Sequence, residues 1–393
     1  MKALQFRRSV PRFAAARIAG EFSAGAGAKV GPLRLVDIDE PDLPAAGWQR
    51  VRPLLSGICG SDLSTIDGRA SRFFEPIVSF PFVPGHEVVG ELDDGRRVVV
   101  EPVLSCAARG IDPPCAFCAA GETGRCQHLA HGHVAAGLQS GYCADTGGGW
   151  STSMVAHASQ VHNVDDSLDD DSAVVIEPTA CAVHAVLRAH VPPGAIVAVI
   201  GAGTLGVIVV AALGRFAEAE HVVVAAKHPE QRALARRLGA HEVVAPSELA
   251  RAVRRADRCQ VIGDRLSGGA HVVLDCVGSG DTICQSLAIA RPGGRVVLVG
   301  MPGTVDVDLA PLWQREVELV GAYAYGTETL NGRAAHTFEL AAELVAAAGL
   351  GRLVSAHYPL EQYREAVDHA AHAGARGATK IVFDLRYERE RRR

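Results

Sequence analysis

Aromatic residues and positive charge are both scarce in this sequence of 393 residues. Phe, Trp and Tyr make up 5% of the chain, and 44 acidic residues outnumber 39 lysines and arginines, for a formal net charge of −5. Binding to nucleic acid generally uses a basic surface for the phosphates and aromatic platforms for the bases. Both shortages therefore argue against a nucleic acid as partner.

Long apolar runs are also lacking. Residues 191–214 carry no charge, but Pro192, Pro193 and several glycines interrupt them. This composition is typical of a turn, a short strand and a loop, and it does not suit one continuous membrane helix. We therefore expect no membrane partner.

The first residues lack the apolar core of a secretory signal. An arginine-containing stretch without acidic residues, up to Glu21, imitates an organelle transit peptide, but the alternation at Leu4 and Phe6 favours a first strand. We therefore expect a cytoplasmic protein. In that setting, clustered members of its ten cysteines are better explained as metal ligands than as disulfides.

The pattern of the chain changes near residue 174. Before it, short β-like runs are punctuated by proline and glycine, which indicates an irregular, mostly β domain. After it, apolar strands alternate with helix-length segments, which predicts an α/β domain with a doubly wound parallel sheet. The expected strands are residues 195–200, 221–226, 272–274 and 295–299. Towards the end we expect helices around residues 340–345 and 363–371, a strand at 380–384 and a solvated charged tail at 386–393.

A glycine-rich loop follows the first strand of the α/β region. Gly201, Gly203 and Gly206 lie in Gly-Ala-Gly-Thr-Leu-Gly, between an apolar strand and an apolar helix. In a dinucleotide-binding loop these glycines make the turn, admit the pyrophosphate and allow close helix packing. The helix N-terminus then faces the phosphates, so the motif predicts a dinucleotide cofactor.

Two sets of candidate metal ligands occur in the first half of the chain. Cys106, Cys115, Cys118 and Cys126 form one set, in which Cys-x2-Cys is followed by x7-Cys, as in closed structural zinc sites. Residues 107–114 separate its first two cysteines and can bulge outward. The second set is dispersed and supplies the ligand types of an open, catalytic zinc site. Its members are Cys59, His86, Glu87 and Glu177.

In this order, the signals resemble a zinc-containing member of the medium-chain dehydrogenase/reductase (alcohol dehydrogenase) family. The resemblance covers nearly the whole chain, and the Glu-Pro pair at 177–178 is similar to the polyol, threonine and sugar dehydrogenase branch. It implies a discontinuous GroES-like β-barrel catalytic domain, residues 1–177 and 324–393, and a Rossmann domain, residues 178–323. It also implies an NAD(P)-dependent alcohol dehydrogenase with one catalytic and one structural zinc, acting on a small-molecule alcohol or carbonyl as a homodimer or homotetramer.

The resemblance assigns roles to the dispersed set. Cys59 and His86 would ligate the catalytic zinc, and Glu87 and Glu177 are alternatives for the third ligand. Ser61 would pass a proton to or from the substrate oxygen. Asp62 would orient His86. Thr204, Leu205 and Cys181 would lie around the cofactor, with Leu205 and Cys181 at the nicotinamide. Lys380 would lie near the pyrophosphate. Ser64 replaces a histidine that often ends the proton relay, so the relay is shorter or ends on His162 or another histidine.

The end of the second α/β strand predicts the choice of cofactor. A carboxylate there usually receives the ribose 2′-hydroxyl of NAD, but this position is Ala226. Lys227 follows it, and His228 or Arg232 could assist in pairing with a 2′-phosphate. The sequence therefore predicts NADP over NAD.

Two alternatives remain open. The same fold hosts zinc-independent reductases of activated double bonds, which lack the dispersed ligand set. A non-catalytic relative that binds zinc and nucleotide would keep every motif, so only metal analysis and activity measurements distinguish it.

Overall fold

The computed structural model describes residues 1–330 and 332–387, and the chain divides into two compact units. Unit 1 contains Met1–Glu177 and the chain from Tyr325 onward, and unit 2 contains Pro178–Ala324. The domain boundary expected from the sequence, with the central domain at 178–323, lies one residue away from this division.

Unit 2 is built on a six-stranded parallel sheet in the order β10-β9-β8-β13-β14-β15. The strands are β8 (Ala195–Ile200), β9 (Ala219–Ala225), β10 (Glu242–Val244), β13 (Ala270–Asp275), β14 (Ala290–Leu298) and β15 (Glu318–Gly321). All six residues of β8 are buried, as expected for a central strand covered on both faces. The predicted doubly wound sheet is therefore confirmed.

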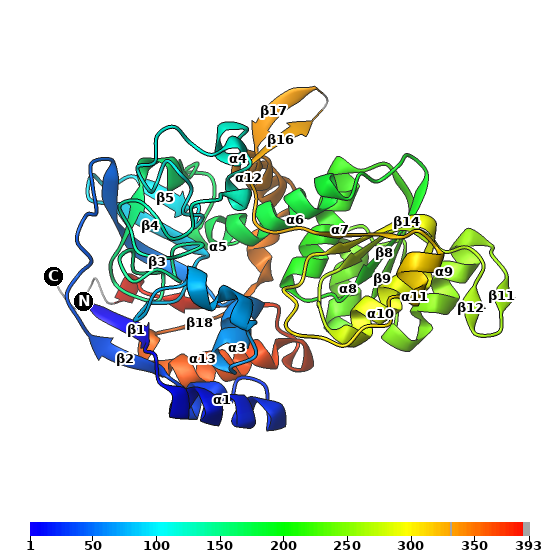
Figure 1. Ribbon diagram of the computed structural model, residues 1–393, viewed down its shortest axis with the longest axis horizontal. Coiled ribbons are helices and arrows are strands. Elements are labelled where there is room, and N and C mark those ends of the chain that lie inside the picture. Colours follow the sequence, from blue (N-terminus) through cyan, green and yellow to red (C-terminus); the bar gives the residue numbers. More distant parts are fainter. Residues whose placement is uncertain (331, 388–393) are drawn as a thin grey trace. The chain divides into compact units, whose positions relative to one another are not determined.

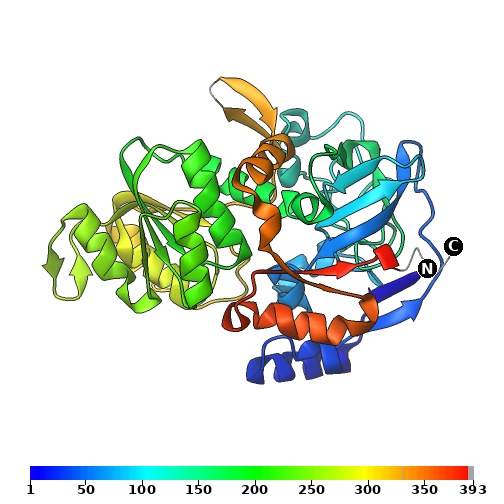
Figure 2. The ribbon, with the colours of Figure 1, turned by 180° about the vertical axis from the view of Figure 1, so that it is seen from behind.

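Helices follow the strands of this sheet (Figures 1 and 2). They are α7 (Thr204–Phe216), α8 (Pro229–Arg237), α9 (Leu249–Asp257), α10 (Gly280–Ile289) and α11 (Ala310–Gln314), with α6 (Ile176–Arg188) before β8. On one face, α9 and α10 pack Leu249, Val253, Ile283 and Leu287 against the strands. The strand order reverses beside β8, which places the glycine loop at the switch point where such sheets bind ligands.

Unit 1 is organised by a mixed sheet, antiparallel apart from the parallel pair β18–β19, to which the last strand of the chain returns. Its order is β18-β19-β3-β4-β5-β7, with β6 also paired to β3. The strands are β3 (Trp48–Gly57), β4 (Val88–Leu92), β5 (Arg97–Val100), β6 (Met154–His157), β7 (Val161–Asn163), β18 (Val354–Tyr358) and β19 (Lys380–Asp384). Because β19 pairs with β3, the C-terminal segment belongs to the same unit as the N-terminal one.

The remaining elements of unit 1 are short apart from three helices. They are β1 (Lys2–Phe6), α1 (Val10–Phe22), α2 (Gly27–Val30), β2 (Leu33–Asp37), α3 (Gly60–Ile66), α4 (Ala116–Ala119), α5 (Asp170–Val174), β16 (Thr327–Leu330), β17 (Arg333–His336), α12 (Thr337–Ala348) and α13 (Tyr363–Ala371). Unit 2 adds the hairpin β11 (Val261–Ile262) and β12 (Arg265–Leu266). The predicted strand at Leu4 and Phe6 is present as β1, paired with β2.

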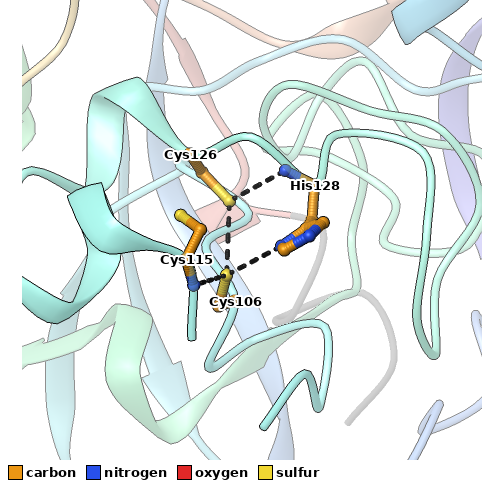
Figure 3. A group of neighbouring side chains, drawn as sticks. All are labelled: Cys106, Cys115, Cys126 and His128. Atoms are coloured by element: carbon orange, nitrogen blue, oxygen red, sulfur yellow. Dashed lines mark hydrogen bonds between the residues drawn. The ribbon is translucent and has the colours of Figure 1, made fainter. Parts of the chain in front are cut away.

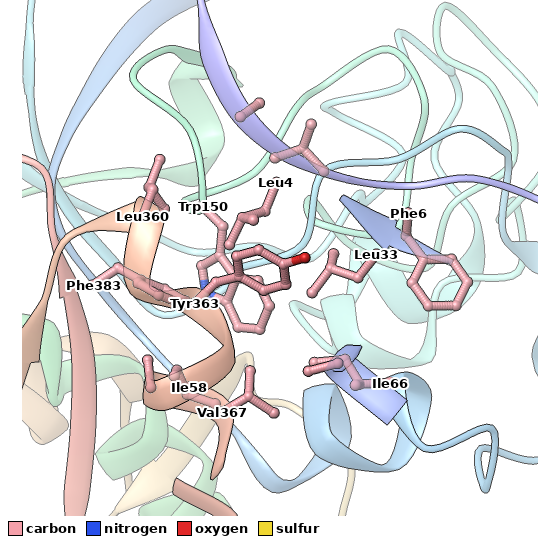
Figure 4. Packing of buried hydrophobic residues seen from close by; sticks show 14 of the residues in the cluster. Leu4, Phe6, Leu33, Ile58, Ile66, Trp150, Leu360, Tyr363, Val367 and Phe383 are labelled. Atoms are coloured by element: carbon pink, nitrogen blue, oxygen red, sulfur yellow. The ribbon is translucent and has the colours of Figure 1, made fainter. Parts of the chain in front are cut away.

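The core of unit 1 forms around Trp150 (Figure 4). This side chain is fully buried, its Nε1 donates to the Gly57 carbonyl at 3.2 Å, and its ring meets Phe383 edge-on at 5.0 Å. Tyr363 and Val367 of α13 complete this core from the C-terminal segment. In the described part of the chain, no helix is both long and apolar enough to span a bilayer.

The charged tail predicted at 386–393 lies largely outside the described residues. Arg386 is described, and it pairs with Asp384 and Asp170 within unit 1. The arginine-containing stretch that imitated a transit peptide folds as α1.

Candidate metal centres and dinucleotide loop

The end of β3 and the start of its partner β4 bring together three candidate ligands, Cys59, His86 and Glu87. Cys59 follows β3 and is the N-cap of α3, while His86 and Glu87 directly precede β4, the antiparallel partner of β3. One ligand atom from each residue lies within 4.8 Å of the others. A thiolate, an imidazole and a carboxylate at this spacing fit a zinc ion with room for a further ligand. The structure thus brings together three of the four residues of the dispersed set.

Asp62 and Ser61 complete the surroundings of this group. Asp62 Oδ1 lies 3.5 Å from His86 Nδ1, and Asp62 Oδ2 accepts a hydrogen bond from the Cys59 amide at 2.9 Å. Tyr142, which sequence reasoning had not placed here, donates to Asp62 Oδ1 at 3.3 Å. Ser61 Oγ is buried and has no hydrogen-bond partner among the described residues.

Glu177 is buried near this group but is not one of its converging ligands. Its Oε1 accepts a hydrogen bond from the Tyr325 hydroxyl at 3.0 Å. Burial, reinforced by the charge of Glu87, raises the pKa of Glu177 to about 7. Of the two alternatives for the third ligand, Glu87 lies with Cys59 and His86, and Glu177 lies with Tyr325.

Lys380 requires a correction. The resemblance assigned it to the cofactor pyrophosphate, but its side chain is buried in unit 1, where the ammonium pairs with Glu87. It also donates to the Ile58 carbonyl at 3.1 Å. Burial alone would lower the pKa of Lys380, but the charges of Glu87 and Cys59 outweigh it and the pKa is raised. The Lys380 ammonium, which was expected at the cofactor pyrophosphate, thus pairs with the buried carboxylate of Glu87.

A cysteine-rich group forms the second centre (Figure 3). Cys106, Cys115, Cys126 and His128 each place a ligand atom within 4.8 Å of the others. Cys106 Sγ lies 3.7 Å from Cys126 Sγ and 3.3 Å from His128 Nδ1. Cys118, one of the four predicted ligands, is not in this group, although its amide donates to Cys115 Sγ at 3.5 Å. His128 was missed, and the Cys-x-His spacing at 126–128 was the available signal.

The cysteine-rich group has the chemistry of a closed metal site. Burial would raise the pKa of Cys115, but amide donors from Gln127 and Cys118 lower it to about 6. A thiolate is the form of cysteine that binds metal. All ten cysteines, each of them in the described part, are free.

A buried arginine holds the segment that follows this group. Arg109 lies in the long interval between Cys106 and Cys115, and its side chain is fully buried with no acidic partner in the described part of the chain. It donates five hydrogen bonds to backbone carbonyls, those of Leu104, His131, Val134, Ala135 and Gly137. This interval was expected to bulge outward, but its Arg109 side chain points into the protein and holds the neighbouring backbone.

The glycine loop has the backbone geometry of a phosphate-binding loop. Gly201 has a φ of +90°, and a Cβ on Gly206 would lie 1.9 Å from the Gly201 carbonyl oxygen. Gly203 is the N-cap of α7, and a Cβ there would meet nothing within 4 Å. The first glycine is thus required by its positive φ and the third by close backbone packing, and the second leaves open space at a helix N-terminus, where an anion binds favourably.

The end of β9 lies beside this loop. Ile200 pairs with Ala225, so Ala226 lies level with Gly201. Ala226 is buried and Lys227 is exposed. Arg232 of α8 donates to the carbonyls of Ala226 at 2.9 Å and Lys227 at 3.2 Å.

The other predicted cofactor residues lie in the first turns of helices of unit 2 or next to them. Thr204 and Leu205 begin α7, and Cys181 lies in α6. His228 is the N-cap of α8. His162, the alternative end of the proton relay, points to Glu101, with Nε2 and Oε2 3.0 Å apart, and does not join the Cys59 group.

Comparisons with known proteins agree with this arrangement. Residues 45–166 match the alcohol dehydrogenase GroES-like domain, and residues 204–347 match the zinc-binding dehydrogenase domain. The chain is 27% identical to a sorbitol dehydrogenase of Arabidopsis thaliana, covering 91% of this chain and 92% of the relative. It is also 27% identical to an L-idonate 5-dehydrogenase of Vitis vinifera, covering 90% and 93%. A solved structure from Sinorhizobium meliloti 1021, described as a zinc-binding dehydrogenase and bound to NADP, is 25% identical, with a TM-score of 0.67 over 90% of this chain and 95% of that one.

Proposed function

The chain belongs to the zinc-containing medium-chain alcohol dehydrogenase family and is an oxidoreductase of CH–OH groups with a nicotinamide cofactor, and we propose that its substrate is a polyol or sugar alcohol. The observation that carries the activity is the convergence of Cys59, His86 and Glu87 beside the unpartnered Ser61 hydroxyl. The names of the relatives support the substrate class.

The residues of the first centre have separable roles in this proposal. Zinc held there would polarise the substrate oxygen as a Lewis acid. Asp62 faces His86 Nδ1 and so leaves Nε2 as the ligand atom, with the ring fixed in orientation. Ser61 Oγ accepts or returns the proton of the substrate hydroxyl, and the Lys380 ammonium pairs with the Glu87 carboxylate.

A coupled screen tests the activity. Purified protein is offered polyols, sugars, secondary alcohols and, as a separate arm, conjugated enones, while reduction or oxidation of the nicotinamide is followed. We expect turnover of polyols that is lost in Cys59→Ser and His86→Ala and kept in the control Cys284→Ser. Turnover of enones alone would favour the zinc-independent reductase. No turnover with any substrate, despite bound zinc and nucleotide, would favour a non-catalytic relative.

We propose in addition that the second centre holds a structural zinc. Cys106, Cys115 and Cys126 supply three ligands, and His128 or Cys118 supplies the fourth. Zinc analysis of His128→Ala and Cys118→Ala separates the two, since only the variant that lacks a ligand should lose about one equivalent of zinc. If both variants keep two equivalents, neither residue is a ligand.

The preferred cofactor in this proposal is NADP. Ala226 removes the carboxylate that would repel a 2′-phosphate, and Lys227 and the guanidinium of Arg232 lie at the same turn. A charge-assisted contact contributes about 1.5–3 kcal/mol, so Lys227→Ala should lower kcat/KM for NADP by roughly 10- to 100-fold and leave NAD unchanged. Arg237→Ala removes an exposed cation from the far end of α8 and is the control. An NAD preference that neither change affects would overturn the assignment.

Assembly as a homodimer or homotetramer is part of the same proposal. Strand β15 lies at the edge of the parallel sheet of unit 2, and an edge strand offers unpaired backbone groups to a second copy. Sedimentation of the purified chain tests it, and a monomer at all concentrations would contradict it.

A further inference from the structure

A third group of ligand atoms lies in unit 1 and shares no residue with the two centres above. Glu101, His162 and His336 each place one ligand atom within 4.8 Å of the others. Glu101 Oε2 is 3.0 Å from His162 Nε2 and 3.3 Å from His336 Nε2. Neither the sequence motifs nor the activity uses this group.

The fold brings these residues together from three separate segments. Glu101 follows β5 and His162 lies in β7, where its backbone partner is Val99. Because alternate residues of a strand share a face, His162 and Glu101 are diagonal neighbours on one face of the strand pair. His336 ends β17, the second strand of the hairpin that leads into α12 (Figure 1).

The charge around the group is negative. The Glu101 side chain is 4% exposed, and the other partner it has is the Thr123 hydroxyl at 3.3 Å. Within residues 1–330 and 332–387, no lysine or arginine pairs with Glu101. Glu328 and Glu339 also act electrostatically on His336. A buried carboxylate is costly to maintain without a cation, so this setting favours a positive ion.

We propose that Glu101, His162 and His336 bind a divalent transition-metal ion such as zinc. Two histidines and one glutamate are a known zinc-ligand set, and with bonds of 2.0–2.1 Å a tetrahedral ion separates its ligands by about 3.3 Å. The two separations from Glu101 are close to that value. Both imidazoles are about a quarter exposed, which leaves a position for water.

The ring of His162 is already held in place for such an ion. It stacks on Phe338 with centroids 4.7 Å apart and planes at 20°. Phe338 is the second residue of α12, so the ion ties this helix and its hairpin to β5 and β7.

The ion competes with hydrogen bonds that exist without it. His336 Nδ1 accepts from the Phe338 amide at 3.3 Å, so the proton of the neutral ring is on Nε2 and faces Glu101. An ion on Nε2 moves that proton to Nδ1 and removes the cap of α12. The third site is therefore weaker than the cysteine-rich centre and is the first to be emptied by a chelator.

Cobalt(II) uptake by the zinc-loaded protein tests the proposal. After mild chelation, which spares the tighter sites, the protein is titrated with cobalt(II), and bound cobalt is measured by equilibrium dialysis and visible absorption. We expect one further ion per chain in the wild type. Glu101→Gln and His336→Asn should lose it, whereas the control His157→Asn, a partly exposed histidine in no ligand group, should keep it.

The test remains decisive if one of the variants fails to fold. If Glu101→Gln fails to fold, His336→Asn decides, because His336 is partly exposed and asparagine can still cap α12. Cobalt uptake in His336→Asn equal to that of the wild type, or no uptake beyond the zinc-filled sites in the wild type, overturns the proposal and leaves a buried carboxylate in contact with two histidines.

Discussion

Replacing Arg109 should destabilise unit 1 far more than its position in a loop suggests. The guanidinium is fully buried and is the donor to five backbone carbonyls between residues 104 and 137. Arg109→Met keeps an unbranched side chain and removes every donor. Each buried carbonyl left without a donor costs about 1 kcal/mol at the low end of the usual range.

The Ala135 carbonyl keeps the Cys143 thiol as a donor. The other four predict a loss of about 4 kcal/mol, and water reaching the partly buried ones reduces this to roughly 3 kcal/mol. For a unit of this size each kcal/mol corresponds to about 2–4 °C in Tm, so we expect a fall of roughly 6–12 °C. The anchored carbonyls after the cysteine-rich group begin at His131, three residues beyond His128. Zinc in the cysteine-rich centre should therefore also be released faster to a chelating dye.

Arg125→Met is the matched control. Arg125 lies in the same region, but its side chain is 53% exposed, pairs with Glu122 and covers the Phe117 ring at 4.2 Å. An exposed pair of this kind contributes at most about 1 kcal/mol. If Arg109→Met and Arg125→Met melt at the same temperature, the carbonyl contacts do not stabilise the fold as argued.

Two further changes test the site and the loop. Tyr325→Phe removes the donor to buried Glu177, and urea denaturation should show a loss of about 1–2 kcal/mol without loss of metal; an unchanged midpoint would contradict the hydrogen bond. Gly206→Ala should abolish binding of NADPH, measured by fluorescence, because its Cβ would lie 1.9 Å from the Gly201 carbonyl. Gly214→Ala is the control, because a Cβ on this glycine of the same helix would meet nothing within 4 Å, and it should bind NADPH as the wild type does. Loss of binding in both variants would contradict the specific role of Gly206.

Four of the six strands of the α/β unit could be predicted because their signals are local. Strand β8 coincides with the predicted apolar run at 195–200, and in unit 1 strand β19 coincides with the one at 380–384. A strand buried on both faces is a continuous apolar segment, and a loop required to bind phosphate carries its glycines in sequence. Helix α1 was missed because its residues are mostly exposed and carry arginines, so its pattern shows no clear apolar face.

The correction at Lys380 depends on a distant partner. Lys380 is near the end of the chain, and only the pairing of β19 with β3 brings its ammonium to Glu87. The resemblance placed Lys380 near the pyrophosphate, and no local pattern points to Glu87 until that pairing is known. Cys118 was chosen for its x2 spacing from Cys115, and His128, which the structure turns towards Cys106, is the alternative that the sequence analysis missed.

The three ligand groups differ in how much of their geometry the sequence encodes. In the cysteine-rich group, all ligands lie between residues 106 and 128, so composition alone indicates it. In the Cys59 group, the ligands come from two strand ends that pair directly, and short motifs around each ligand identify it. In the Glu101 group, the ligands need the register of β5 and β7 together with His336 of a hairpin, 174 residues beyond His162 along the chain, and no motif accompanies them. A metal site of that last kind is visible only after folding, which is why cobalt uptake by Glu101→Gln and His336→Asn is a test of the fold as much as of the ligands.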